Sequence, residues 1–289
     1  MFELISFLIA LIGSSVAAAF DLKITPTEIP DEIPYAMIGL ALILVCVQSF
    51  LKMNFNLLFD SLIYGISFLA FGYIMYKFGQ WGGGDAKLLA AIGFLSPGLS
   101  SFTKNVQYPF AFSYLLNVFI VGATYILFYA IGLSILNRKI IFRFFKSVKS
   151  NSNVILISSP ILFLIFLFGN WYLFNSLGIE ASFLSILSNS FLLLSLSIVL
   201  FLVWKFVKAV EEIAFKKRIS VSKLKVGDVL LESKVWDGIT ERELRSIRRS
   251  GKKFVVIKEG VRFAPAFPLA LLFTLFFGDG ILLLLRILV

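Results

Sequence analysis

Eight long apolar stretches, separated by polar or charged segments, set the pattern of this chain. A helix needs roughly 17–25 apolar residues to cross the hydrocarbon core of a bilayer. The stretches that reach or approach this length lie at 2–20, 33–51, 57–78, 86–101, 112–136, 154–176, 182–207 and 263–286. The stretch 86–101 is the shortest of them, and the region 154–207 allows a different division. The pattern predicts an all-α polytopic membrane protein with about eight transmembrane helices.

The segment 209–262 departs from this pattern, because it is charged and mixed in polarity. Val226–Leu231 follows a turn and is predicted to form a strand. Lys253–Lys258 alternates apolar and basic residues, as a strand with one solvated face does. Between the two, Thr240 and Glu243 have the spacing of a capping box, which predicts the start of a short helix. The segment is therefore expected to be a small α+β cytoplasmic insertion.

These patterns divide the chain into three predicted parts. A transmembrane catalytic domain occupies 1–208, a small basic cytoplasmic domain occupies 209–262, and the last transmembrane helix lies at 263–289. The middle part is too short to bury a large core alone. It is either a folded loop that stabilises the helix packing or a platform that positions a substrate.

Lysine and arginine are unevenly distributed between alternate connecting segments. If the segment after the first span is cytoplasmic and the sides alternate, 24 of the 27 basic residues lie in the cytoplasm. This bias is the one that sets membrane orientation, and it predicts a multi-pass protein of the cell membrane with both termini outside. Asp21, at the end of the first span, and Asp85, before the fourth, then lie on the same cytoplasmic face.

The composition narrows the possible chemistry. Hydrophobic residues make up 59% of the 289, the mean hydropathy is +0.93, histidine is absent and Cys46 is the single cysteine. A histidine-activated nucleophile, a His-based zinc site and a disulfide are thereby excluded, and no metal or cofactor is expected. The net charge of +10 fits attraction to anionic lipid better than binding to nucleic acid. Hydrolysis would have to use carboxylates or a Ser/Lys pair.

Asp21 and Asp85 are the candidate carboxylates. An acid beside a membrane span is costly and usually functional, although each could also be a helix-end acid paired with Lys23 or Lys87. Two carboxylates held together cannot both ionise readily. One can then take a proton from water while the other donates a proton to a scissile carbonyl.

Three glycines, Gly82, Gly83 and Gly84, come directly before Asp85. Glycine allows a backbone that most residues cannot adopt, and it lets another chain approach closely. An extended substrate segment could therefore pair backbone to backbone beside Asp85. A glycine-rich turn alone is weak evidence, and its value here comes from the pairing with Asp21.

Other acids near the spans fit structural roles. Glu28 and Glu32 lie in a proline-rich loop and are expected to be solvated, while Asp31 is expected to cap the next helix. Asp60 fits an acid near a helix N-terminus. Asp279 either breaks the last helix or binds a partner such as Lys104.

At these residues the chain resembles the type IV prepilin and preflagellin peptidases, which are membrane aspartyl proteases of the GxGD type. The run from Gly82 to Gly93, GGGDAKLLAAIG, is similar to their second-aspartate motif. Asp21, followed by Ile29-Pro30-Asp31 and Gly39-Leu40, resembles the stretch around their first aspartate. Residues 263–268, FAPAFP, resemble the proline-rich entry into their final helix.

The resemblance implies a catalytic pair of Asp21 and Asp85, with Gly82, Gly83, Gly84 and Lys87 as weaker candidates for substrate binding. The implied substrates are membrane-anchored pilin or flagellin precursors, cleaved at the cytoplasmic face. The paired Cys-x-x-Cys motifs of bacterial members are missing, so their methylation activity is not implied. The extra spans at 154–207 exceed the six of archaeal preflagellin peptidases and leave the choice between pilin and flagellin open.

Three alternatives stay open. A presenilin-like intramembrane protease shares GxGD, but this chain has Pro268-Leu269-Ala270 in place of a Pro-Ala-Leu motif. An ion-coupled transporter could use membrane aspartates as relays, and it would be expected to have inverted repeats. A Ser/Lys peptidase is the third, although no serine and lysine stand in a persuasive arrangement. The oligomeric state is not predicted.

Overall fold

The computed structural model describes residues 2–23, 29–100, 107–233 and 238–283. The chain forms two compact units, one of residues 1–129 with 217–289 and one of residues 130–216. We describe each unit by itself. The three-part division by sequence, with boundaries at 208 and 262, stays a prediction.

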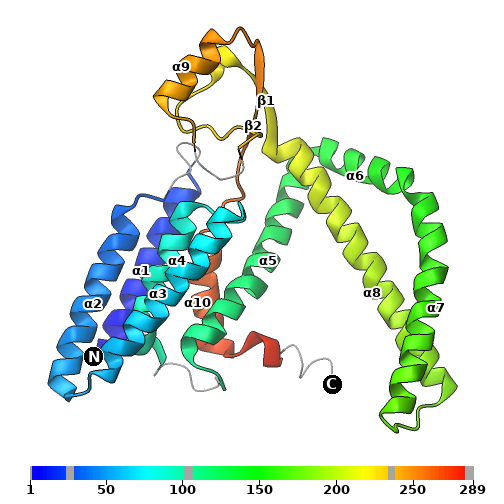
Figure 1. Ribbon diagram of the computed structural model, residues 1–289, viewed down its shortest axis with the longest axis horizontal. Helices are drawn as coiled ribbons and strands as arrows, with labels where there is room; N and C mark the ends of the chain where they lie inside the picture. The colour runs from blue at the N-terminus through cyan, green and yellow to red at the C-terminus, as the bar shows by residue number, and fades with distance from the viewer. Residues whose placement is uncertain (1, 24–28, 101–106, 234–237, 284–289) are drawn as a thin grey trace. The chain divides into compact units, whose positions relative to one another are not determined.

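The first unit is a helical bundle built around one central helix (Figure 1). The central helix is α4 (Gly83–Leu99), and it contacts α1, α2 and α3. The other helices of the bundle are α1 (Phe2–Asp21), α2 (Glu32–Lys52), α3 (Asn56–Lys77), the first part of α5 (Phe110–Leu136) and α10 (Ala266–Phe277). Since α1 and α3 end where α4 and α10 begin, all four of these helix termini lie at one end of the unit.

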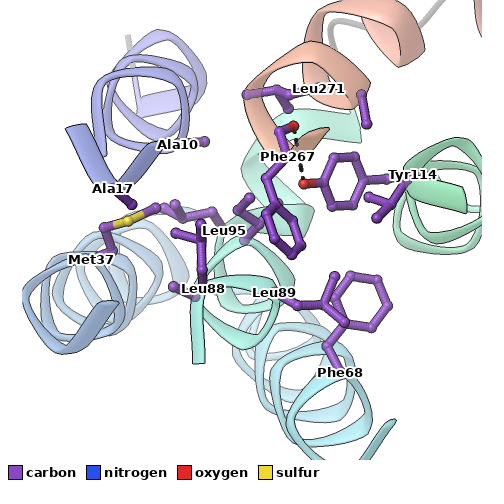
Figure 2. Close-up of a cluster of buried hydrophobic side chains, with 14 of the residues drawn as sticks. Ala10, Ala17, Met37, Phe68, Leu88, Leu89, Leu95, Tyr114, Phe267 and Leu271 are labelled. Atoms are coloured by element: carbon purple, nitrogen blue, oxygen red, sulfur yellow. Dashed lines mark hydrogen bonds between the residues drawn. The ribbon is translucent and has the colours of Figure 1, made fainter. Parts of the chain in front are cut away.

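Helix α4 is surrounded by protein, as its burial shows. Leu88, Leu89, Ile92 and Leu95 are fully buried, and Figure 2 shows their neighbours coming from several other helices. In the same cluster, the hydroxyl of Tyr114 donates to the carbonyl oxygen of Phe267 at 3.3 Å. Inside a bilayer, dense packing of this kind holds helices together, because lipid is as apolar as the side chains.

Small residues bring α3 and α4 together. A Cβ atom at Gly72 would lie 2.8 Å from Cα of Ala86, and one at Gly93 would lie 2.8 Å from the carbonyl oxygen of Tyr64. Neither position has room for a larger side chain. Glycine at these two positions therefore allows the close approach of α3 and α4, and Gly72 does so at the first turn of α4, next to Asp85.

The structure bears out a polytopic membrane protein and refines the expected spans. Each of the eight predicted stretches contains a helix, and six of these helices are long and apolar enough to cross a membrane. The two shorter ones are α4, with 17 residues, and α10, with 12. The stretch 263–286 is thus not one continuous helix. Gly278, with φ of +73°, ends α10, and a new helical turn follows.

Asp279 belongs to this break in the last span. Its carboxylate accepts hydrogen bonds from the Ser113 hydroxyl and from the backbone N–H of Gln107, the latter at 2.7 Å. Asn117 also stabilises the break. Its side-chain amide donates to the carbonyl oxygen of Gly278 at 2.8 Å and accepts from the N–H of Gly280 at 3.0 Å. Of the two roles expected for Asp279, the structure supports the helix break. Its alternative partner Lys104 lies outside the described residues.

The insertion before α10 is a small α+β unit, as expected. It contains β1 (Lys216–Ser220), a short 3₁₀ turn (Val221–Lys223), α9 (Glu241–Arg249) and β2 (Phe254–Lys258) around a core of Leu224, Ile239 and Ile257. The capping box is confirmed, since the N–H of Thr240 donates to Glu243 at 2.7 Å and the N–H of Glu243 donates to the Thr240 hydroxyl at 3.3 Å. The strand expected at Lys253–Lys258 is also confirmed.

The strand expected at Val226–Leu231 is wrong. This stretch makes only a single antiparallel bridge, from Leu230 to Ile257, and the neighbour of β2 in the sheet is β1. The cause is a turn at Gly227, whose φ is +93°, followed by Asp228, which accepts a hydrogen bond from the N–H of Lys225 at 2.8 Å. An extended strand cannot contain this turn.

The second unit consists of the end of α5, then α6 (Arg138–Ser150), α7 (Ser152–Ser176), α8 (Phe183–Val210) and a π-helical turn, η2 (Glu211–Phe215). The structure supports two separate helices in the region 154–207, and the amide of Asn170 donates to the Ser190 hydroxyl between them at 3.0 Å. Helix α7 has no buried residue. Helix α6 is amphipathic and short, and the pattern of long apolar stretches does not predict it.

Candidate active site

Asp21 is the last residue of α1, and it is buried, with 9% of its surface exposed. One of its carboxylate oxygens, Oδ2, accepts a hydrogen bond from the backbone N–H of Ala264 at 3.0 Å. Next to it, the Arg262 guanidinium donates to the carbonyl oxygen of Leu22 at 2.8 Å. The segment that leads into α10 thus holds the end of α1 at two points.

Asp85 lies in the first turn of α4 and is equally buried, at 9% exposed. Its Oδ2 atom accepts a hydrogen bond from the backbone N–H of Gly82 at 3.1 Å. Gly82 precedes the helix in an extended conformation, with φ of −74° and ψ of 159°. A carboxylate in the first helical turn satisfies an unpaired N–H and is favoured by the helix dipole. The local sequence therefore fixes this side chain.

The fold brings Asp21 and Asp85 to the same end of the first unit, and they are near enough to interact electrostatically. Each carboxylate has one oxygen fixed by a backbone N–H. Within the part of the chain that the structure describes, neither Oδ1 atom accepts a hydrogen bond. Two buried carboxylates that each present a free oxygen can share a proton and orient a water molecule.

The three glycines before Asp85 do not adopt the unusual backbone conformation that glycine allows. None of the three has a positive φ, so the expectation of an unusual backbone is wrong. A Cβ atom at Gly84 would lie 2.9 Å from Cβ of Ile29, and one at Gly82 would lie 3.3 Å from Oδ2 of Asp85. At Gly83 the nearest atom is 4.0 Å away, on Tyr76. The protein itself fills the space at Gly84, and a role of the three glycines in binding substrate stays a prediction.

Lys87 pairs with Asp31 and not with either candidate aspartate. Its Nζ atom donates to both carboxylate oxygens of Asp31 at 2.6 Å and lies 5.4 Å from the ring centre of Tyr35. Asp31 occupies the position before α2, but its side chain makes no capping hydrogen bond. Lys23 lies 3.8 Å from the ring centre of Phe20. Glu28 lies outside the described residues.

An aromatic cluster joins the two segments that hold the aspartates, and the sequence did not predict it. Trp81 comes directly before the glycines and is buried, with its ring 5.5 Å from that of Phe263 and 5.9 Å from that of Phe267. Phe263 in turn comes directly before Ala264. The FAPAFP motif pointed to this segment, but no local pattern identified Arg262, Ala264 or Trp81 as contacts of the site.

Among the residues that the structure describes, no three Cys, Asp or Glu side chains are grouped in a way that could hold a metal ion.

The fold and the site together define a polytopic membrane protein with a buried pair of aspartates at one end of a helical bundle. The type IV leader peptidase family matches residues 7–133 of the chain, which contain both aspartates. Prepilin peptidase EppA of Methanothermobacter thermautotrophicus is 26% identical over 147 residues. The aligned part covers 47% of this chain and 38% of the relative. Both comparisons show that the N-terminal part of the chain is similar to the type IV leader peptidase family, which agrees with the resemblance found in the sequence.

Proposed function

We propose that this protein is a membrane aspartic endopeptidase that removes the N-terminal leader peptide from type IV pilin-like or archaeal flagellin precursors. The family of residues 7–133 and the similarity to a prepilin peptidase support cleavage of a prepilin-type leader. The aspartic mechanism, the flagellin substrate and a site on the cytoplasmic side are our extension of that support.

The pair of buried aspartates is the observation that carries this proposal. The ionised carboxylate takes a proton from a water molecule as the oxygen attacks the scissile carbonyl, and the protonated carboxyl donates its proton to the carbonyl oxygen. The tetrahedral intermediate then expels the amine, which receives a proton from one carboxyl group, while a hydroxyl group of the intermediate returns a proton to the other carboxylate. Backbone N–H groups hold Asp21 and Asp85, so the two carboxylates are oriented before the substrate arrives, which lowers the barrier.

The position of the pair suits a substrate that is anchored in the membrane. Asp21 ends a helix long enough to span, and Asp85 begins another helix at the same end of the unit. The site therefore lies at the edge of the membrane span and not at its centre. A precursor with a charged leader before a hydrophobic segment would present its cleavage site at this depth.

The test is leader cleavage by the Asp21→Asn and Asp85→Asn variants of the full chain, co-expressed with a pilin precursor. Each variant should insert normally and lose activity by at least about a hundredfold, the lower range for an acid–base group. Asp60→Asn is the matched control, because Asp60 is an exposed acid on α3 and should leave cleavage unchanged. Normal cleavage by either aspartate variant would eliminate the two-aspartate mechanism. A flagellin precursor tested in parallel identifies the preferred substrate.

A further inference from the structure

Helix α6 connects two helices that are long and apolar enough to span a membrane. It has 13 residues, which span about 20 Å at 1.5 Å per residue, and this is too short to cross a hydrocarbon core of about 30 Å. It follows α5 after the single residue Asn137 and precedes α7 after the single residue Asn151. Both α5 and α7 are long enough to span. If α5 and α7 both cross the membrane, α6 runs along its surface, because the chain enters α6 from one span and leaves it into the other.

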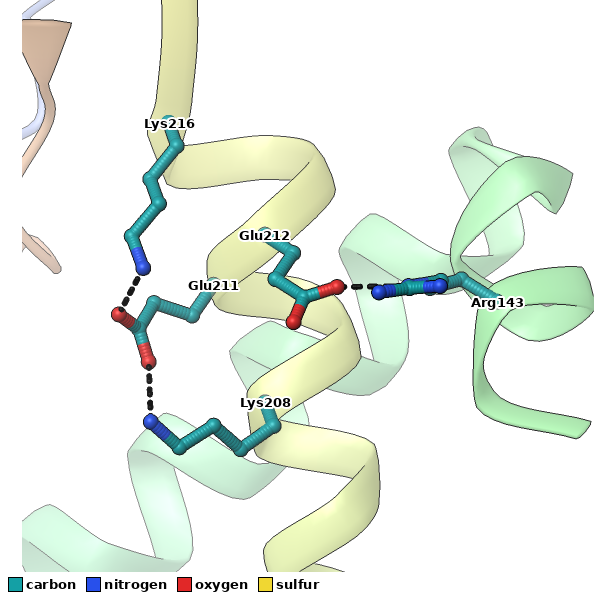
Figure 3. A network of polar contacts seen from close by, with 5 residues as sticks. All are labelled: Arg143, Lys208, Glu211, Glu212 and Lys216. Atoms are coloured by element: carbon teal, nitrogen blue, oxygen red, sulfur yellow. Dashed lines mark hydrogen bonds and ion pairs between the residues drawn. The ribbon is translucent and has the colours of Figure 1, made fainter. Parts of the chain in front are cut away.

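One side of α6 packs on protein. Ile140 is fully buried, and the ring of Phe144 lies 5.8 Å from that of Phe206 on α8, edge to face. Arg143 adds a polar contact, because its Nε atom donates to Glu212 on η2 at 2.6 Å. Figure 3 shows this pair beside Glu211, which is paired with Lys208 and Lys216. These contacts fix the rotation of α6 about its axis.

The remaining surface of α6 combines exposed apolar and basic side chains. Ile141, Phe142 and Phe145 are exposed by 38%, 73% and 62%. The helix contains five basic residues and no acidic residue. Only Arg143 takes part in an ion pair within the described residues, and the four uncompensated ones are Arg138, Lys139, Lys146 and Lys149. The helix thus presents large apolar groups next to four unpaired positive charges.

We propose that α6 is a binding site for anionic phospholipids. Its exposed Ile141 and Phe145 enter the boundary of the acyl region, and Lys139, Lys146 and Lys149 bind the headgroup phosphates. Amphipathic helices bind membranes in this way when aromatic and basic side chains are combined, and each basic residue near the surface adds to the attraction. A cluster of phosphates supplies the charge that these lysines lack within the protein. The proposal does not depend on the peptidase function.

The experiment compares lipid binding by the purified full chain in a non-ionic detergent. Native mass spectrometry gives the apparent Kd for phosphatidylglycerol and for phosphatidylcholine. The unmodified protein should prefer phosphatidylglycerol, and the triple variant K139A/K146A/K149A should bind it at least about tenfold more weakly, because three headgroup contacts are lost. The triple variant K139R/K146R/K149R keeps the charge and should keep the preference.

The matched control is K223A/K225A/K252A, which removes three exposed lysines from the small insertion. It should bind phosphatidylglycerol as the unmodified protein does. The proposal is overturned if the unmodified protein shows no preference for phosphatidylglycerol, which would direct attention to an acidic protein as the partner of α6. It is also overturned if the α6 variant keeps the preference, or if the control loses it to the same extent.

Discussion

The backbone N–H of Ala264 donates a hydrogen bond to Oδ2 of Asp21 at 3.0 Å, although 243 positions of sequence separate the two residues. Ala264 directly follows the small insertion and comes just before α10. One of the candidate catalytic carboxylates is therefore oriented by the segment that joins the insertion to the last helix. The insertion thus leads directly into the segment that orients Asp21, whereas its role as a platform that positions a substrate stays a prediction.

Arg262 offers a way to test this positioning. Its guanidinium binds the carbonyl oxygen of Leu22, next to Asp21. The variant Arg262→Ala should lower kcat for leader cleavage about three- to tenfold with little change in KM, since one hydrogen bond from a charged group is lost at an exposed position. Arg262→Lys should recover part of the activity. Steady-state kinetics with a purified precursor measures both constants.

The matched control for Arg262 is Arg245→Ala, which breaks an exposed ion pair with Glu241 inside α9 at 2.9 Å. Pairs of this kind contribute little to stability, so its kinetics should match those of the unmodified protein. Equal losses in both variants would contradict a specific role for Arg262.

Trp81 should be important for both stability and activity, because it links the segment before Asp85 to the segment that holds Asp21. Trp81→Ala leaves a cavity beside Phe263 and Phe267 and should lower the free energy of unfolding by about 3 kcal/mol. Trp81→Phe keeps an aromatic ring and should cost less than half as much. Thermal unfolding in detergent gives the order of stabilities, and equal stability of the alanine variant would contradict the linking role.

The parts of this site that the sequence could predict are those whose residues lie close together in the sequence or follow a general rule of membrane topology. Asp85 and Gly82 are three residues apart, so a local motif marked them, as the capping box marked Thr240 and Glu243. Asp21 and Asp85 could be placed on one face because membrane alternation is a global rule that needs only the count of spans. No such rule predicts the hydrogen bond from Ala264 to Asp21, because every residue except proline has a backbone N–H.

The predictions that the structure corrected, and the helix that was not predicted, have equally specific physical causes. The predicted strand at Val226–Leu231 was judged by its apolar residues, while the turn at Gly227 decided its structure. Helix α6 was not predicted because it is short and has a basic face, whereas the predicted spans are long and apolar. Gly82, Gly83 and Gly84 were expected to allow an unusual backbone, but none has a positive φ, and Gly84 makes space for Ile29. A local turn decided the first case, helical periodicity the second and tertiary packing the third.

Gly93 tests the close packing of α3 on α4. A Cβ atom there would lie 2.8 Å from the carbonyl oxygen of Tyr64 and 3.1 Å from Cα of Gly65. These are backbone atoms that cannot move away alone, so Gly93→Ala should destabilise the protein by about 1–3 kcal/mol. Gly132→Ala is the matched control, because no atom lies within 4 Å of a Cβ placed there. It should be neutral or slightly stabilising by helix propensity, and a neutral Gly93→Ala would refute the packing argument.

Glu243 should make the stability of α9 depend on pH. Hydrogen bonds from the backbone N–H and the hydroxyl of Thr240 lower the pKa of Glu243 below its ordinary value. A carboxyl whose pKa is lower in the folded state adds stability above its unfolded pKa, and this stability is lost as the pH falls through the folded pKa. Protection of the α9 amides against hydrogen exchange, measured on the full chain, should therefore decrease below about pH 4. In Glu243→Gln that pH dependence should be weaker, and an unchanged profile would contradict the assignment.

Substitutions of Lys87 and Asp31 can distinguish a role of Lys87 in substrate binding from a structural role. Their ion pair is partly exposed, with 30% and 55% of the two side chains accessible, so Asp31→Asn should cost less than about 1 kcal/mol of stability. If Lys87 binds the precursor, Lys87→Met should raise KM about tenfold with kcat nearly unchanged, while Asp31→Asn should leave KM within about twofold because the lysine remains available. Kinetics of both variants and of the double variant decide the matter. Equal effects of the two single substitutions would mean that Lys87 serves only as the partner of Asp31, although Lys87 lies two residues after Asp85, the aspartate that the proposed mechanism requires.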